Sequence, residues 1–245
     1  MNKKESYKKY SFCFFNRNGG VSRNNFFSLN CAYQKGDSNK NVEKNREIAA
    51  NLFKKKNIVL LNQVHSNKII KIKNKTNNNM SADAMISSRK DILLGVLTAD
   101  CAPIIVLGKN NFGIIHAGWR GTTNGIIENS ITKFLSEGER IEFLKVVVGP
   151  HLKKQSFEVK NDFIEDIKKS VKDSEKFLTR NKERIFFDFS KFIKNKLQKL
   201  GILNYDISEE DTFSNPESFF SYRYCTINKI KNCGRQISLV GIKNN

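Results

Sequence analysis

TADCAPIIVLGKNNFGIIHAGWRG, at residues 98–121, contains two short apolar runs, each next to a residue that can bind a metal. The runs at 103–107 and 112–116 have the composition of buried strands, and the polar residues 109–111 between them favour a turn. Glycines at 118 and 121 bend the chain, and Thr122 or Thr123 can cap a helix that reaches about residue 135. The stretch therefore predicts a strand–turn–strand unit followed by a helix.

Short strands and helices are interleaved along the rest of the chain. The patterns predict strands at 10–16, 58–64, 68–73, 92–98, 144–148, 218–224 and 235–242, helices at 41–55, 158–171 and 189–200, and a polar loop at 74–80. No internal repeat, long linker, G-x-G-x-x-G fingerprint or Walker A loop is present. We therefore expect the α/β class with a mixed, α+β-like sheet, in one layered domain spanning 1–245 with an ordered core at about 10–243.

The composition gives a formal net charge of +19. This charge would suit an anionic partner, but the lysines are scattered and form no continuous basic arm, so we expect no specific nucleic-acid partner. The five cysteines show no paired framework, which favours reduced thiols in the cytoplasm. No apolar run approaches the ~18 residues that span a bilayer, and no signal-peptide core is visible, so we expect no membrane association.

One thiol and two imidazoles are candidate metal ligands: Cys101, His65 and His116. Three ligands rather than four are typical of a catalytic zinc site, in which one position stays open, and the long spacings do not match a zinc finger. Copper also accepts these ligands. Two alternatives stay open: Cys101 is a buried small side chain beside two core or surface histidines, or it is a nucleophile that His116 activates.

Further candidate site residues have polar or aromatic side chains near these segments. Asp100 precedes Cys101 and is a candidate for anchoring the loop or for acid–base catalysis. Trp119 and Arg120 are candidates for lining a pocket that holds a planar ring and an anion. Other arginines suited to phosphate are Arg23, Arg46, Arg223 and Arg235. A packed tryptophan and surface ion pairs are the competing interpretations.

An ordered series of motifs resembles the YfiH family, also called laccase-domain proteins or the purine nucleoside phosphorylase/polyphenol oxidase family. The motifs are NGGVS at 18–22, SLN at 28–30, KNR at 44–46, QVHS at 63–66, ADA at 82–84, TADC at 98–101, HAGWRG at 116–121, VGP at 148–150, FEV at 157–159, FFSYR at 219–223 and GRQ at 234–236. The resemblance covers nearly the whole chain, and TADC followed by HAGWRG is its most specific part.

The resemblance implies a single α/β/β/α layered domain with zinc at His65, Cys101 and His116. It implies a broad-specificity purine nucleoside phosphorylase, acting on adenosine, inosine, guanosine and methylthioadenosine, with adenosine deaminase activity. The substrates would be purine nucleosides and phosphate, with a monomer or weak homodimer expected. Members have also been described as copper-dependent polyphenol oxidases and as editors of peptidoglycan precursors, so an amidase with Cys101 as nucleophile or ligand, and a copper oxidase, are the alternative functions.

For catalysis, Arg46, Arg223 or Arg235 would contact phosphate, and Asp100 or Glu158 would act as general acid or base. The chain departs from the family pattern at two places. His151 follows VGP where a small residue or cysteine is usual, and we do not expect it to be a ligand. The segment YCTINKIKNC at 224–233 is longer than the usual turn and is expected to alter access at one edge of the site.

Overall fold

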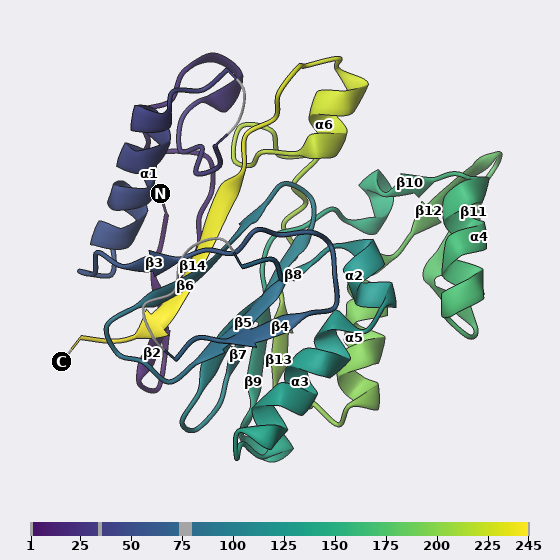
Figure 1. Ribbon diagram of the computed structural model, residues 1–245. Helices are drawn as coiled ribbons and strands as arrows, with labels where there is room; N and C mark the ends of the chain where they lie inside the picture. Colours follow the sequence, from purple (N-terminus) through teal and green to yellow (C-terminus); the bar gives the residue numbers. More distant parts are fainter. Residues whose placement is uncertain (1, 34–35, 74–79, 245) are drawn as a thin grey trace.

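Two β-sheets pack face to face and carry helices on their outer faces in the computed structural model, which describes residues 2–33, 36–73 and 80–244 (Figure 1). The first sheet has the order β1 (Glu5–Tyr7), β2 (Tyr10–Phe14), β14 (Gln236–Ile242), β6 (Leu93–Thr98), β3 (Ile58–Val59). The second has the order β13 (Tyr205–Ile207), β9 (Lys145–Val148), β7 (Ala102–Leu107), β8 (Phe112–Ala117), β5 (Ala84–Ser87), β4 (Ile69–Lys71). Both sheets mix parallel and antiparallel pairs, which confirms the mixed α/β class.

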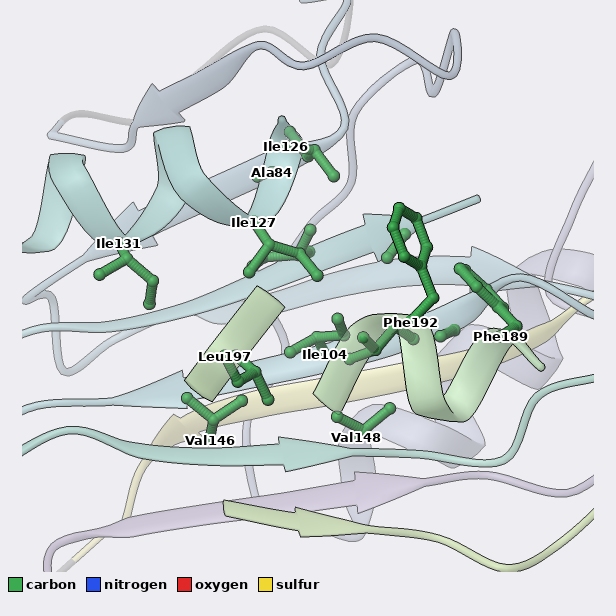
Figure 2. Packing of buried hydrophobic residues seen from close by; sticks show 14 of the residues in the cluster. Ala84, Ile104, Ile126, Ile127, Ile131, Val146, Val148, Phe189, Phe192 and Leu197 are labelled. Atoms are coloured by element: carbon green, nitrogen blue, oxygen red, sulfur yellow. The ribbon is translucent and has the colours of Figure 1, made fainter. Parts of the chain in front are cut away.

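Three apolar clusters separate the four layers. Helix α1 (Asn39–Asn51) packs on the outer face of the first sheet through a cluster that includes Ala49, Phe53 and Leu239. The two sheets meet through a cluster that includes Phe12, Val240 and Ile114. On the outer face of the second sheet lie α3 (Ile126–Ser136) and α5 (Phe189–Lys199) (Figure 2). This α/β/β/α layering buries both faces of the central strands, which explains why their sequences are continuously apolar rather than alternating.

The predicted strand–turn–strand unit is the β7–β8 pair. Its register runs from Ala102 opposite Ala117 to Leu107 opposite Phe112, and every residue in both strands is buried. The carboxylate of Glu139 accepts hydrogen bonds from the backbone N–H groups of Lys109, Asn110 and Asn111 at 2.6–2.8 Å, so it fixes the turn. This pair places His116 one residue from the end of β8.

A small three-stranded sheet lies to one side of the sandwich, beyond α2 (Trp119–Thr123) and α5 (Figure 1). It comprises β10 (Glu158–Val159), β12 (Arg184–Phe187) and β11 (Leu178–Asn181), with α4 (Asn161–Ser170) beside it. The remaining helices are α2 (Trp119–Thr123), α6 (Tyr222–Ile227) and the 3-10 turns Asn24–Phe26, Ile141–Phe143, Lys154–Ser156 and Ser174–Phe177. Across the described ranges, no helix is both long and apolar enough to cross a membrane.

Some sequence predictions were wrong in detail. The predicted strand at 218–224 is a loop followed by α6, because the Ser221 hydroxyl caps that helix by accepting from the Tyr224 N–H. The helix predicted from Thr122 or Thr123 begins earlier as α2, and Gly125, at φ +91°, separates it from α3. The helix predicted at 158–171 begins only after β10. The predicted loop at 74–80 lies, except for residue 80, outside the described residues.

Candidate metal centre

Three segments from both sheets meet at one rim of the sandwich. His65 lies in the loop between β3 and β4, and His116 lies on β8. Cys101 lies where the chain passes from β6 in the first sheet to β7 in the second. Each of these residues offers one ligand atom, and the three atoms lie within 4.8 Å of one another. The fold therefore brings together the three candidate ligands, which are 36 and 15 residues apart in the sequence (101 − 65 and 116 − 101).

The buried carboxylate of Asp83 organises this cluster. It accepts from His116 Nδ1 at 2.8 Å, which leaves Nε2 of that ring as the atom available to a metal. It also accepts from the backbone N–H groups of His65 at 3.0 Å and Ser66 at 2.6 Å, and from the Ser66 hydroxyl at 2.8 Å. One carboxylate thus fixes both histidines. Sequence reasoning assigned Asp83 no role, although the ADA motif contains it.

Backbone conformation also shapes the site. His65 has φ +57°, in the left-handed region that non-glycine residues seldom occupy, and its loop is held by the hydrogen bonds to Asp83. Gly118 lies against the cluster: a Cβ there would be 2.7 Å from His65 Nδ1 and 3.2 Å from Cys101 Sγ. Only glycine fits at position 118 without moving a candidate ligand.

Neighbouring charges shift the pKa values of both histidines in the cluster. Burial lowers the pKa of His116, but the neighbouring Cys101 and the hydrogen bond to Asp83 outweigh it and raise the pKa to about 9. Burial and the charge of His116 lower the pKa of His65, and Arg120 and Arg235 lower it further. An exposed His65, a half-buried Cys101 and a buried His116 leave the site accessible from the His65 side.

The donor set fits zinc. A thiol and two imidazoles are ligands that zinc prefers, and the open approach beside His65 suits a three-ligand site. The hydrogen bond from His116 Nδ1 to Asp83 is the carboxylate–histidine arrangement that usually supports a metal ligand. Within the described residues, no other group of three or more metal-ligating side chains was found.

The carboxylate of Asp100 is held by partners outside this cluster. Its carboxylate accepts from the Thr212 hydroxyl at 2.7 Å and from the Arg223 backbone N–H at 2.6 Å. Burial raises the pKa of Asp100, and its hydrogen bonds oppose that shift. Asp100 has φ +85°, so these hydrogen bonds hold a strained backbone one residue before Cys101. This geometry favours the anchoring interpretation of Asp100.

The arginines divide by location. Arg120 and Arg235 are close enough to His65 to lower its pKa. The Arg235 guanidinium donates to the carbonyls of Cys233 and Gly234 at 2.8 and 2.9 Å. The Arg120 guanidinium lies 4.2 Å from the Trp119 ring centroid. These two arginines are the best placed to meet an anion near the cluster.

The other predicted site residues have structural partners. Trp119 packs against Phe163 of α4, with ring centroids 4.5 Å apart. Arg46 donates to the Cys31 carbonyl at 2.8 Å. Arg223 donates to the Glu158 carbonyl at 2.9 Å, and the Glu158 carboxylate pairs with Arg184 at 2.6 Å. The Glu158 carboxylate is therefore directed to a surface ion pair.

A cleft of about 600 Å³ lies between the two sheets and is lined by residues that include Phe14, Pro150 and Ser208. None of the three candidate ligands lines it. Its walls combine apolar side chains such as Phe14 and Val148 with polar ones such as Asn2 and Glu210, and among the described residues they contain no group of three metal-ligating side chains.

His151 is buried in the core. Its Nδ1 donates to the Gly149 carbonyl at 2.8 Å, and its Nε2 lies 2.9 Å from the Ser190 hydroxyl. Burial and the nearby Lys153 lower the pKa of His151 to about 3. The imidazole is therefore neutral in the folded protein at neutral pH.

This pKa predicts an acid-sensitive fold. The folded-state pKa of His151 lies below the unfolded value of about 6.5, so the unfolded chain takes up the proton first. The stabilisation is complete above pH 6.5 and is lost as the pH falls toward 3, by up to about 1.4 kcal/mol per pH unit. Between pH 6.5 and 5, wild type should lose about 2 kcal/mol more than His151→Gln in urea unfolding. Equal losses in both proteins would contradict this assignment.

The fold and the rim cluster define a class of protein: a four-layer α/β/β/α sandwich with a cysteine and two histidines gathered at the crossing between its sheets. A family model described as "multi-copper polyphenol oxidoreductase laccase" matches residues 11–243. The chain belongs to this family, which is the YfiH family that the motifs indicated.

Similar proteins are known from several bacteria. A protein named purine nucleoside phosphorylase from Rickettsia prowazekii is 33% identical over 183 residues, covering 73% of this chain and 75% of its own. Purine nucleoside phosphorylase YfiH of Escherichia coli is 29% identical, covering 95% and 94%. Among solved structures, hypothetical protein YfiH of Bacillus licheniformis has a TM-score of 0.89 at 25% identity, covering 97% and 94%. A Neisseria meningitidis protein, at TM-score 0.86 and 23% identity over 99% of each chain, shares the fold.

Proposed function

We propose that this chain is a zinc-dependent purine nucleoside phosphorylase of broad specificity that also deaminates adenosine. The convergence of His65, Cys101 and His116 at an open rim is the observation that carries the proposal. Relatives named purine nucleoside phosphorylase support the reaction class. The proposed substrates are adenosine, inosine, guanosine and methylthioadenosine, with inorganic phosphate as the second substrate of phosphorolysis.

In this proposal, His65, Cys101 and His116 hold zinc, which when bound supplies a Lewis acid at the open side of the cluster. Asp83 keeps the His116 ring oriented by accepting from Nδ1. Gly118 leaves room for both His65 and Cys101. The protein thus holds the ligands in place before substrate arrives.

Phosphorolysis needs an anion site close to the nucleoside. Phosphate attacks ribose C1′ as the purine leaves, and the positive charges of Arg120 and Arg235 near His65 are suited to holding the phosphate. Arg46 and Arg223 also donate to backbone carbonyls, as Arg235 does, but they are not among the charges that act on His65, so we propose that they shape the segments that carry them. Trp119, which carries Arg120 over its ring, would keep that guanidinium in place.

The role that we propose for Asp100 is to position Cys101. Its two carboxylate oxygens are occupied by Thr212 and Arg223, so it ties the Cys101 segment to the start of α6. A catalytic role for Asp100 as general acid or base would require those contacts to break. The Glu158 carboxylate, paired with Arg184, is a weaker acid–base candidate for the same reason.

A second candidate is an amidase or editing hydrolase in which Cys101 is the nucleophile. One observation favours it: the Cys101 sulfur and a ring nitrogen of His116 lie within 4.8 Å of each other, so the two side chains are neighbours, as a thiol–imidazole pair requires. The name of the family model refers to copper oxidation. The relatives, however, carry the name purine nucleoside phosphorylase. In the described ranges there is a single group of three metal-ligating side chains. Zinc is therefore the metal that we propose.

We propose that the protein works in the cytoplasm. All five cysteines are free, which suits a reducing compartment. A monomer or weak homodimer remains our proposal for its assembly.

The experiment that tests the function is incubation of metal-replete protein with adenosine, with and without phosphate, followed by chromatography. Adenine and ribose 1-phosphate should appear only with phosphate, and inosine should appear in both samples. Absence of all three products would reject the proposal. Release of amino acids from peptidoglycan-precursor peptides, with no nucleoside turnover, would favour the amidase instead.

A further inference from the structure

Two free cysteines meet beside the metal centre in the segment that is longer than the family pattern. Cys225 lies in α6, and Cys233 lies just before β14. The Ile230 N–H donates to the Cys225 carbonyl at 2.8 Å, so the segment folds back on itself. Cys225 packs against the small apolar cluster that Cys233 forms with Ala99 and Phe220. The fold therefore brings the two cysteines into one cluster although eight positions separate them.

The two thiols differ in exposure. Cys233 is only 6% exposed and packs against Ala99 and Phe220. Cys225 is half-buried and packs against the outside of that cluster, so reagents in solution reach it first. This asymmetry is typical of an attacking thiol and a resolving thiol in disulfide exchange.

The surroundings are cationic. The Arg235 guanidinium donates to the Cys233 carbonyl at 2.8 Å, and the Arg17 guanidinium lies 4.4 Å from the Phe220 ring centroid. The neighbouring Cys233, with help from Arg235 and Arg17, lowers the pKa of Cys225 against the effect of burial. Cys225 is therefore more easily ionised at neutral pH than an ordinary cysteine.

We propose that Cys225 and Cys233 form a thiol-oxidation site, which a low-molecular-weight disulfide converts into an intramolecular disulfide. The Cys225 thiolate attacks one sulfur of the reagent RSSR, forms a mixed disulfide and expels RS⁻. Cys233 then loses its proton, attacks the Cys225 sulfur and expels the second RS⁻. The two thiolates take up the two protons, so the balance is two cysteine thiols and RSSR giving one cystine and two RSH.

This pair of cysteines lies close to the segment that carries the candidate ligand Cys101. Cys233 packs against Ala99, which is two residues before the candidate ligand Cys101. Asp100 accepts from the Arg223 N–H in the first turn of the helix that carries Cys225. A disulfide would therefore join α6 to the start of β14 on the wall that Asp100 ties to Cys101.

Peptide mapping of the intact protein tests the site. Metal-loaded full-length protein is incubated with excess oxidised glutathione at pH 7, then denatured with N-ethylmaleimide and digested with trypsin without reduction. Cleavage after Arg223, Lys229, Lys231 and Arg235 leaves Cys225 in peptide 224–229 and Cys233 in peptide 232–235. We expect these two peptides joined by a disulfide, both without N-ethylmaleimide, and separated again by reductant.

Two internal controls sharpen the result. The buried Cys13 and Cys31 should carry N-ethylmaleimide throughout. In Cys233→Ser, Cys225 should retain glutathione because no second thiol resolves it. The proposal is overturned if wild type gives both peptides alkylated, or if Cys225 stays glutathionylated while Cys233 is alkylated.

Discussion

Cys101→Ala is expected to remove zinc from the purified protein and to abolish nucleoside phosphorolysis. Cys101 supplies the one thiol of the cluster, and without it two imidazoles remain, of which His65 is exposed. Loss of a direct ligand should lower zinc affinity by more than the 10–100-fold that follows loss of an outer partner, so by at least about 100-fold. Elemental analysis after dialysis, together with adenosine turnover on the same sample, measures both effects.

Cys225→Ala is the matched control for this experiment. Cys225 is also a half-buried cysteine, but it lies outside the three-ligand group, so its variant should keep zinc and turnover. Full zinc occupancy in Cys101→Ala would contradict the ligand assignment. Retained zinc with lost turnover would instead favour Cys101 as a nucleophile.

The second large effect is expected from Asp83→Asn. The carboxylate accepts from His116 Nδ1 and from the backbone N–H groups of His65 and Ser66, and an amide has one acceptor oxygen where the carboxylate has two. The NH₂ group of the new asparagine would face one of the N–H donors that the Asp83 carboxylate accepts from, and almost no solvent reaches this site. We expect zinc affinity to fall by about 10–100-fold and the free energy of unfolding to fall by about 1–3 kcal/mol.

Competition with a coloured chelator measures the affinity, and urea unfolding of the metal-free protein measures the stability. The control is Asp91→Asn, which changes an aspartate paired with Arg89 near the surface and should alter neither quantity by much. If Asp83→Asn binds zinc as tightly as wild type, Asp83 does not orient His116 for a metal.

The central fold was predictable because its strands are buried on both faces. The runs that form β7 and β8 are continuously apolar, and the turn between them is polar, so composition alone located both strands. The short strands β11, β12 and β13 were missed because they are three or four residues long and only one of their residues, Phe187, is fully buried. The pairings of β12 with β10 and of β13 with β9 join segments distant in the sequence, which local patterns do not record.

The candidate ligands were predictable from residue chemistry, and their supporting contacts were not. A cysteine and two histidines are rare enough here to be noticed, because the chain has three histidines in all. Asp83 is one of many acidic residues, and its importance comes from a loop that turns three N–H groups toward it. Similarly, the YRYC stretch has the composition of a strand, but it forms α6 because the Ser221 side chain caps the start of a helix there.

X-ray absorption at the zinc edge of the loaded protein tests the proposed centre most directly. A site formed by His65, Cys101 and His116 predicts one sulfur at about 2.3 Å and two imidazole nitrogens at about 2.0–2.1 Å, with a light atom in the fourth position. Cys101→Ala should eliminate the sulfur shell. A sulfur-free zinc shell in wild type, or two or more sulfurs around the metal, would contradict the assignment.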